Sequence, residues 1–344
     1  MRDATSEQRG VAACTDAERR RAEELARALR RSGRDARVVA LWVRPAWRLV
    51  QTLCAVAAVG ASVLAVDSAI TGLAIAAAAL LLAAADLSSR PLLRRLTPAR
   101  ATQNVISTAP PRPGSRPVTL ILTASTDDPR RGLAAALPLR ITSATLGAQL
   151  LLVALLAARA AGSDGLWLDA AQLLPTLALL ALIALLLERP APTPQPAPAA
   201  DRVLALAQRL DELPPHNLDV AVVLAGAGED HAAGLRTWLR ERRKRGLDPD
   251  SVAIVNVEPN AGESAVWWER DGLVVGAPMH AQLVHAARRA APQSSEPGGR
   301  RAVTTAAGIV RVDGWPAISI RADVAFAHAL VTELDAALGE RHDA

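Results

Sequence analysis

Acidic residues follow three apolar, β-branched segments that the sequence predicts to be buried strands. The carboxyl ends of parallel strands meet at one edge of a sheet, where α/β folds place their chemistry. Carboxylates gathered there suit hard or borderline cations, and two metal ions held in this way can hydrolyse amides. Acids at strand ends are also common caps and turn residues, so the spacing alone leaves both interpretations open. The acids concerned are Asp127, Asp128, Glu229, Asp230 and Glu258.

Histidines are the usual companions of carboxylates in metal sites. His231 follows the second group of acids and is the best placed, although a surface histidine in the first turn of a helix is the commoner case. His280 and His285 are five residues apart, which does not align them on one helix face. The sequence assembles no Ser-His-Asp triad, so nucleophilic catalysis is not indicated.

A glycine pair offers a second kind of site. Gly226-Ala-Gly228 lies between a predicted strand and a predicted helix, where glycines let a dinucleotide phosphate approach a helix N-terminus. His231 stands at the third glycine position, and Glu229 and Asp230 would repel phosphate. The dinucleotide hypothesis is therefore the weaker one.

Predicted strands alternate with predicted helices, which indicates an α/β sheet covered on both faces. An amphipathic helix over 16–33 is expected to begin at Thr15 or Asp16 and to end at Gly33. The predicted strands are 37–43, 103–108, 117–124, 219–225, 251–257 and 316–320, with a hairpin over 267–275 around Asp271-Gly272. The other predicted helices are 200–213, 231–245, 279–291 and 325–338.

Two long stretches with few charges interrupt this pattern. The 344-residue chain is 51% hydrophobic with a positive mean hydropathy, which is typical of membrane proteins. A bilayer span needs about 20 apolar residues. The stretches predict four spans in two hairpins, with a soluble hydrophobic hairpin as the alternative for the first pair. The spans are 47–66, 69–87, 141–160 and 167–187.

Arginine asymmetry predicts the orientation of these spans. The leader, the segment 88–140 and the tail are rich in arginine, whereas both tight turns carry acids and no base outside Arg159. The positive-inside rule then places both termini in the cytoplasm of a multi-pass protein of the bacterial inner (plasma) membrane, with membrane lipids as partners. The basic run 236–245 is a solvated helix end or a lipid-binding surface. No aromatic stripe interleaves the arginines, so no nucleic acid partner is expected.

Five motifs together have the order expected of one family of hydrolases. They are Thr102-Gln-Asn-Val105, the strand 118–124 followed by Ser-Thr-Asp-Asp-Pro-Arg, the strand 219–225 followed by Gly-Ala-Gly-Glu229, Val255-Asn-Val-Glu258, and Gly314-Trp-Pro-Ala-Ile-Ser-Ile320. In this order the chain resembles the family 28 metallopeptidases, two-zinc aminopeptidases and their relatives. The resemblance implies a three-layer α/β/α mixed sheet, here interrupted by the four spans.

The chain departs from the ligand pattern of that family. The resemblance expects an Ala-His-x-Asp loop, but Ser125 replaces the histidine while Asp127 remains as the acid that would orient it. The expected Glu-Glu pair reads Gly228-Glu229, which keeps a ligand-type acid without the general base. The expected Asn-x-Asp ligand appears with Glu258 in place of aspartate.

Two further ligands of the family have no counterpart. The place of the bridging aspartate is filled by a proline-rich segment, and no histidine follows the strand that ends near Arg321. Catalytic zinc needs about three protein ligands and a base within reach of the bound water. The resemblance therefore leaves Glu229, Glu258 and Asp127 as vestigial metal positions. It predicts no catalytic residue and no cofactor, with zinc as the alternative.

The predicted function follows from this loss. We expect a non-catalytic binding or scaffolding module for a protein or peptide, with an active membrane-bound zinc peptidase using Glu229, Glu258 and His231 as the alternative. Transport ranks last, since it would need polar residues in mid-span and the spans offer little apart from Thr71, Gln149 and Gln172. The expected domains are 1–45 (first helix and strand), 46–88 (hairpin), 89–140 (central strands), 141–188 (hairpin), 189–200 (Pro-rich linker) and 201–344 (remainder of the α/β domain).

Overall fold

The computed structural model divides the chain into two compact units. The α/β unit comprises 1–45, 99–129 and 192–344, and the helical unit comprises 46–98 and 130–191. The described residues are 10–88, 90, 92–109, 118–128, 130–131, 138–163, 165–188, 191–192, 199–228, 230–259, 265–272, 276–291, 300–301 and 305–342.

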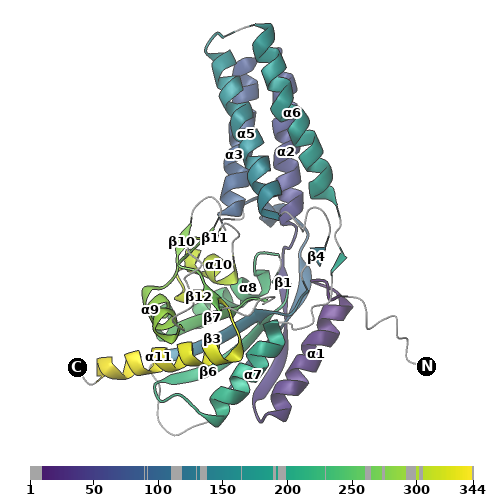
Figure 1. Cartoon of the computed structure of the whole chain (residues 1–344). Helices are drawn as coiled ribbons and strands as arrows, with labels where there is room; N and C mark the ends of the chain where they lie inside the picture. The colour runs from purple at the N-terminus through teal and green to yellow at the C-terminus, as the bar shows by residue number, and fades with distance from the viewer. Residues whose placement is uncertain are drawn as a thin grey trace. The chain divides into compact units, whose positions relative to one another are not determined.

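A seven-stranded mixed sheet forms the centre of the α/β unit (Figure 1). The strand order is β1-β2-β6-β3-β7-β12-β8. The four strands β6, β3, β7 and β12 run parallel, and β1, β2 and β8 add antiparallel pairs at the two sides. The bounds are Asp35–Val43 (β1), Arg100–Thr108 (β2), Val118–Ser125 (β3), Leu218–Ala225 (β6), Val252–Val257 (β7), Val266–Trp267 (β8) and Ala317–Arg321 (β12).

Helices cover both faces of this sheet, as the alternating pattern predicts. Helices α1, α7 and α11 pack together on one face, in front of the sheet in Figure 1, and α8 and α10 pack on the other. The prediction of a covered mixed sheet is confirmed, and its strands come from both sides of each apolar hairpin. The bounds are Asp16–Arg31 (α1), Ala199–Glu212 (α7), Ala233–Lys244 (α8), Ala281–Ala290 (α9), Ala306–Val312 (α10) and Val324–His342 (α11).

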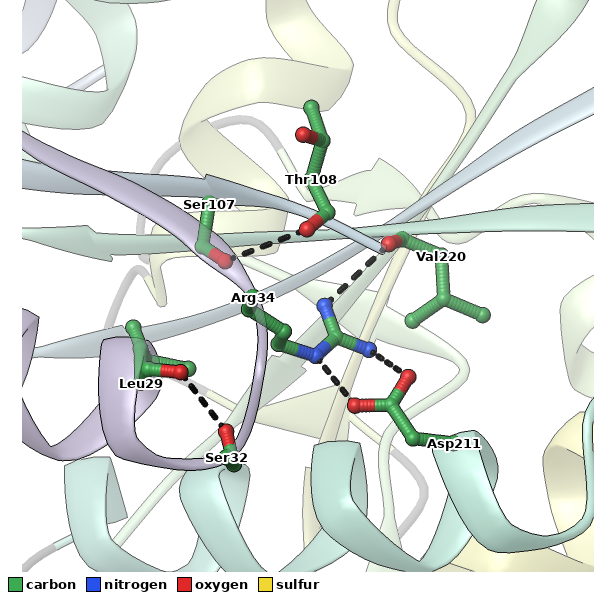
Figure 2. A network of polar contacts seen from close by, with 7 residues as sticks. All are labelled: Leu29, Ser32, Arg34, Ser107, Thr108, Asp211 and Val220. Atoms are coloured by element: carbon green, nitrogen blue, oxygen red, sulfur yellow. Dashed lines mark hydrogen bonds and ion pairs between the residues drawn. The ribbon is translucent and has the colours of Figure 1, made fainter. Parts of the chain in front are cut away.

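A buried ion pair joins the first strand to the chain beyond the second hairpin. Arg34 donates from Nε and Nη2 to the carboxylate of Asp211 at 2.7 and 2.8 Å, and from Nη1 to the carbonyl of Val220 at 3.3 Å (Figure 2). The Arg34 side chain is 0% exposed and that of Asp211 is 18% exposed. This fork-to-carboxylate geometry holds the start of β1 against the end of α7.

The helical unit consists of four long apolar helices, and each is long and apolar enough to cross a membrane. Alanines fill much of the interior between α2 and α3, and Gly72 lies against the backbone of Ala61 where no Cβ would fit. The predicted four helices in two hairpins are confirmed. The bounds are Trp47–Leu64 (α2), Ala69–Leu87 (α3), Pro138–Ala160 (α5) and Leu166–Leu187 (α6), with the short helix Leu93–Leu96 (η1) and strands Arg130–Arg131 (β4) and Ala191–Pro192 (β5).

The predicted hairpin over 267–275 is wrong at Trp267, and its residues 273–275 lie outside the described part of the chain. Trp267 belongs to β8 and pairs with Ile320 of the main sheet, because its side chain is buried in the core and stacks on Phe326. Arg270–Asp271 (β9) instead pairs with Ala277–Pro278 (β10) and with Arg300–Arg301 (β11). Most of the predicted linker 189–200 lies outside the described residues.

Candidate functional site

Asp127 lies in the turn that follows β3, at the carboxyl edge of the parallel strands. Its Oδ1 accepts hydrogen bonds from Ser125 Oγ and, at 2.7 Å, from the backbone N–H of Gly228. Asp127 is 7% exposed. Ser125 stands where the resemblance expects a histidine. It donates a hydrogen bond to Asp127, the acid that would have oriented that histidine. Asp127 acts as a clamp between the ends of β3 and β6.

Glu18, in the first turn of α1, is a second carboxylate that contacts the loop after β6. It is fully buried, and its oxygens accept hydrogen bonds from Ala227 N at 2.8 Å, Cys14 N at 2.9 Å and Thr102 Oγ1 at 3.0 Å. The pKa of Glu18 is raised to about 7, chiefly by burial and with a smaller contribution from the charge of Asp127, against the lowering effect of the hydrogen bonds. A carboxyl with such a pKa has the proton affinity of a general base, but a fully buried side chain is closed to substrate.

Residues 226–228, the glycine loop, have three backbone N–H groups, and each donates to a side chain. Gly226 N donates to Asn104 Oδ1 at 3.0 Å, while the next two amides hold Glu18 and Asp127. A Cβ at Gly226 would lie 2.5 Å from Glu18 Oε1, and one at Gly228 would lie 2.2 Å from Ser125 Oγ. These glycines therefore admit carboxylates of the chain itself, where the dinucleotide hypothesis required them to admit phosphate.

Left-handed backbone conformations shape this loop. Ala227, His231 and Ala232 have φ values of 50°, 61° and 47°, a region that non-glycine residues rarely adopt. Ala232 N donates to Gly228 O at 2.9 Å, and α8 begins at the next residue. The turn costs backbone strain and in return points successive amides at the buried acids.

Glu258 lies in a different hydrogen-bonded chain, at the end of β7. Its Oε1 accepts from Asn256 Nδ2 at 2.6 Å, and the same Nδ2 donates to Ser319 Oγ at 2.9 Å. Ser319 Oγ donates to Thr305 Oγ1 at 2.8 Å, and Thr305 hydrogen-bonds Asp271. The Asn-x-Glu pair thus connects β7 to β12 and to the segment before α10.

The two described acids among the predicted metal positions are held apart by separate hydrogen bonds. Asp127 and Glu258 follow adjacent parallel strands, β3 and β7, but each carboxylate is held by its own set of donors. Glu229 lies outside the described residues. Within the described part of the chain, no three His, Cys, Asp or Glu side chains come together in a group that could hold a metal ion.

Glu18 and Cys14 are the site residues that the sequence analysis missed. Burial, followed by the charges of Glu18, Asp230 and Asp127, raises the pKa of Cys14 to about 12, which makes the thiol a poor nucleophile. The sequence does carry a signal for Glu18. Thr15-x-x-Glu18 is a capping-box pattern, and Thr15 Oγ1 accepts from Glu18 N at 3.4 Å. Glu18 reaches back to the N–H of Cys14 and also inward to the loop.

The basic run on α8 is largely engaged within the α/β unit. Arg236 and Arg240 pair with Asp313 at 2.7 and 3.5 Å, and Arg243 lies 4.7 Å from the ring of Trp315. The pKa of Asp313 is lowered by the hydrogen bonds and charges of the two paired arginines, against its burial. These contacts favour the helix-end interpretation of the run over a lipid-binding surface.

Comparison with known proteins gives a likeness in fold. No protein-family model matches the sequence, and no curated protein matches it significantly. BSAP, a zinc aminopeptidase from Bacillus subtilis, is 10% identical over 97% of this chain and 91% of its own, with a TM-score of 0.41. Porphyromonas gingivalis glutaminyl cyclase is 11% identical over 96% and 92%, with a TM-score of 0.42.

A third neighbour is matched over less of its length. The aminopeptidase from Aneurinibacillus sp. strain AM-1 is 12% identical over 70% of this chain, which covers 46% of that chain, with a TM-score of 0.33. At these identities and scores the neighbours assign no residue of this chain a role.

Proposed function

We propose that this protein is a membrane-embedded, non-catalytic binding or scaffolding module for a protein or peptide partner. The observation that carries the proposal is the state of the two described carboxylates at the expected metal positions. Asp127 and Glu258 each accept hydrogen bonds from donors of this chain, at 2.7 Å from Gly228 N and 2.6 Å from Asn256 Nδ2. A metal ion would have to compete with these donors for the same oxygen atoms.

The donor set also fits zinc poorly. Zinc favours imidazole and thiolate, and a catalytic site uses about three protein ligands with one open position. Ser125 offers a hydroxyl where the resemblance expects an imidazole, and Gly228 offers no side chain where it expects the general base. Two carboxylates without imidazole would hold zinc weakly and would have no base to activate its water.

Metal analysis of the purified full-length protein tests this proposal. We expect less than one zinc per ten chains after dialysis against zinc-containing buffer, and no release of N-terminal residues from peptides. The alternative, an active peptidase using Glu229, Glu258 and His231, requires one or two zinc ions per chain. Under that alternative the zinc is lost in Glu229→Ala/Glu258→Ala but kept in the control Glu241→Ala, an exposed acid of α8. That result would overturn the non-catalytic proposal.

The membrane part of the proposal rests on the outer surface of the helical unit. No more than 44% of the residues of any candidate span are buried. Large apolar side chains are exposed along the helices, such as Ile70 at 73%, Leu81 at 70% and Leu174 at 69%. Lipid chains would cover this surface. Trp47 and Trp167 stand at the starts of α2 and α6, positions that suit tryptophans at a membrane interface.

Labelling of single added cysteines tests the orientation. The proposal places both termini in the cytoplasm and the turn at Ser163 outside the inner membrane. In spheroplasts, Ser163→Cys should react with an impermeant maleimide before lysis, whereas Arg37→Cys, on the exposed side of β1, should react only after lysis. The wild-type chain measures the background from its two cysteines. The reverse pattern would invert the proposed topology.

A further inference from the structure

Gln149 is the central residue of α5 and one of the most completely buried polar residues of the helical unit. It is 0% exposed and lies about 16 Å from either end of its 23-residue helix, from the rise of 1.5 Å per residue. Neither its Nε2 nor its Oε1 has a hydrogen-bond partner among the described residues. An amide with two donors and an acceptor therefore lies at mid-helix inside the bundle.

Beyond Gln149, toward the end of α5, the buried face of the helix is apolar. The inner face of α5 continues with Leu152 and Leu156, which belong to the same buried cluster as alanines of the neighbouring helices. Burial of an amide without hydrogen bonds is strongly unfavourable, and hydrocarbon around a helix offers no hydrogen bond in exchange. A bound molecule that hydrogen-bonds the amide removes this cost.

A second buried glutamine of the helical unit has hydrogen-bond partners at both ends of its amide. Gln172 of α6 is also buried, and its Nε2 donates to Ser62 O at 2.7 Å and to Ser62 Oγ at 2.9 Å. Its Oε1 accepts from Arg159 Nη1 at 2.9 Å. Both ends of that amide are engaged by the protein, so Gln172 needs nothing further.

The chemistry of the unmatched amide selects the class of ligand. A cation would satisfy only Oε1 and an anion only Nε2, and either would bring an unpaired charge into the bundle. A small neutral molecule that both donates and accepts satisfies both ends. We propose that the interior of the helical unit holds bound water at Gln149. Thr145 lies one turn earlier on the same buried face, and its hydroxyl, which donates to Ile141 O at 2.8 Å, retains acceptor capacity for that water.

Bound water of this kind has the usual number of partners. Internal waters make about three hydrogen bonds to otherwise unsatisfied groups. Gln149 Oε1, Gln149 Nε2 and Thr145 Oγ1 supply three such groups on one helix face. The site therefore needs no charged residue, which suits the middle of a membrane span.

Nuclear magnetic resonance on the full-length protein in lipid nanodiscs tests the proposal. Glutamine side chains are labelled with ¹⁵N, and magnetisation transfer from water to each side-chain amide is measured. The Gln149 signal is identified by its loss in Gln149→Met or, should that variant not fold, in Gln149→Asn. We expect a water cross-peak at the Gln149 amide and none at the Gln172 amide. In Thr145→Val the Gln149 cross-peak should weaken at least twofold.

Two results would overturn the proposal. One is an absent water cross-peak at Gln149 in the wild-type protein while exposed glutamines show theirs. The other is a thermal midpoint that rises in Gln149→Met, because removal of a truly unsatisfied amide stabilises the bundle, whereas removal of a hydrated one leaves the midpoint nearly unchanged.

Discussion

Two buried charged groups join the N-terminal segment to the rest of the α/β unit, and they are satisfied in opposite ways. Arg34 meets the carboxylate of Asp211 in a two-pronged ion pair and adds the carbonyl of Val220 (Figure 2). Among the described residues, Glu18 accepts from the neutral donors of Cys14, Thr102 and Ala227, and its acidic neighbour is Asp127. The first group is neutralised by its partner, whereas the second is neutralised most readily by a proton.

The two regions therefore contribute differently to the stability of the fold. A paired buried charge contributes little net stability but is costly to break, since removal of one partner leaves the other charge buried alone. An unpaired buried acid makes stability depend on pH through its raised pKa. The Arg34 region therefore fixes the architecture, and the Glu18 region makes the loop between β6 and α8 sensitive to protonation.

The largest expected effect comes from breaking the paired group. Asp211→Asn leaves the guanidinium of Arg34, whose side chain is 0% exposed, without a counter-charge. We expect a loss of about 3–5 kcal/mol in the free energy of unfolding. Urea-induced unfolding of the full-length protein in detergent, followed by tryptophan fluorescence, measures this loss.

A more exposed ion pair to the same helix, α7, supplies the control. Arg21 of α1 and Asp201 of α7 pair at 2.7 Å, but their side chains are 27% and 49% exposed. Asp201→Asn should cost no more than about 1 kcal/mol. Equal losses in the two variants would show that burial does not distinguish the pairs.

The next effect concerns the unpaired group. Burial raises the pKa of Glu18 from 4.5 to about 7, so the folded protein holds this proton more tightly than the unfolded chain. Stability from this group is therefore highest at low pH and falls as pH rises from about 4.5 to about 7. Glu18→Gln removes the titration. Between pH 5 and pH 8 the unfolding free energy of the wild type should fall by about 2–3 kcal/mol relative to the variant.

Unfolding curves at several pH values measure this change. The comparison uses the difference between the two proteins, because both share all other titrating groups. A difference that stays constant from pH 5 to pH 8 would mean that Glu18 is ionised throughout and that its three donors outweigh its burial.

The sequence was sufficient for the elements and insufficient for the networks. Period-2 and period-3.6 patterns placed the strands of the sheet, and apolar length placed the four long helices, because both signals are local. The hairpin prediction at Trp267 failed because a buried aromatic side chain packs best in the main sheet, a tertiary contact that local turn residues do not encode.

The candidate site shows the same limit. Asp127 was recognised from its place after a strand, but its partner Gly228 is 101 residues away. Glu18 was not singled out in the sequence, because its contact with Ala227 spans 209 residues. Only the strand order β2-β6-β3 brings these segments to one sheet edge. The capping-box pattern of Thr15 and Glu18, ahead of the first strand, is the sequence signal that could have identified Glu18.

The smallest expected effect links the two acids of the loop. The charge of Asp127 is one of the causes that raise the pKa of Glu18, ranked below burial. Asp127→Asn keeps an oxygen that can accept from Gly228 N but removes that charge, so the pKa of Glu18 should fall by less than about one pH unit. A carboxyl ¹³C titration of Glu18, with Asp128→Asn as control, measures the shift. Asp128 accepts from Val11 N at 2.8 Å and is not among the groups that shift Glu18, so its variant should leave the midpoint in place. If the midpoint of Glu18 moves equally in both variants, its raised pKa reflects the summed charge of the nearby acids. The specific effect of Asp127 on Glu18 would then be contradicted.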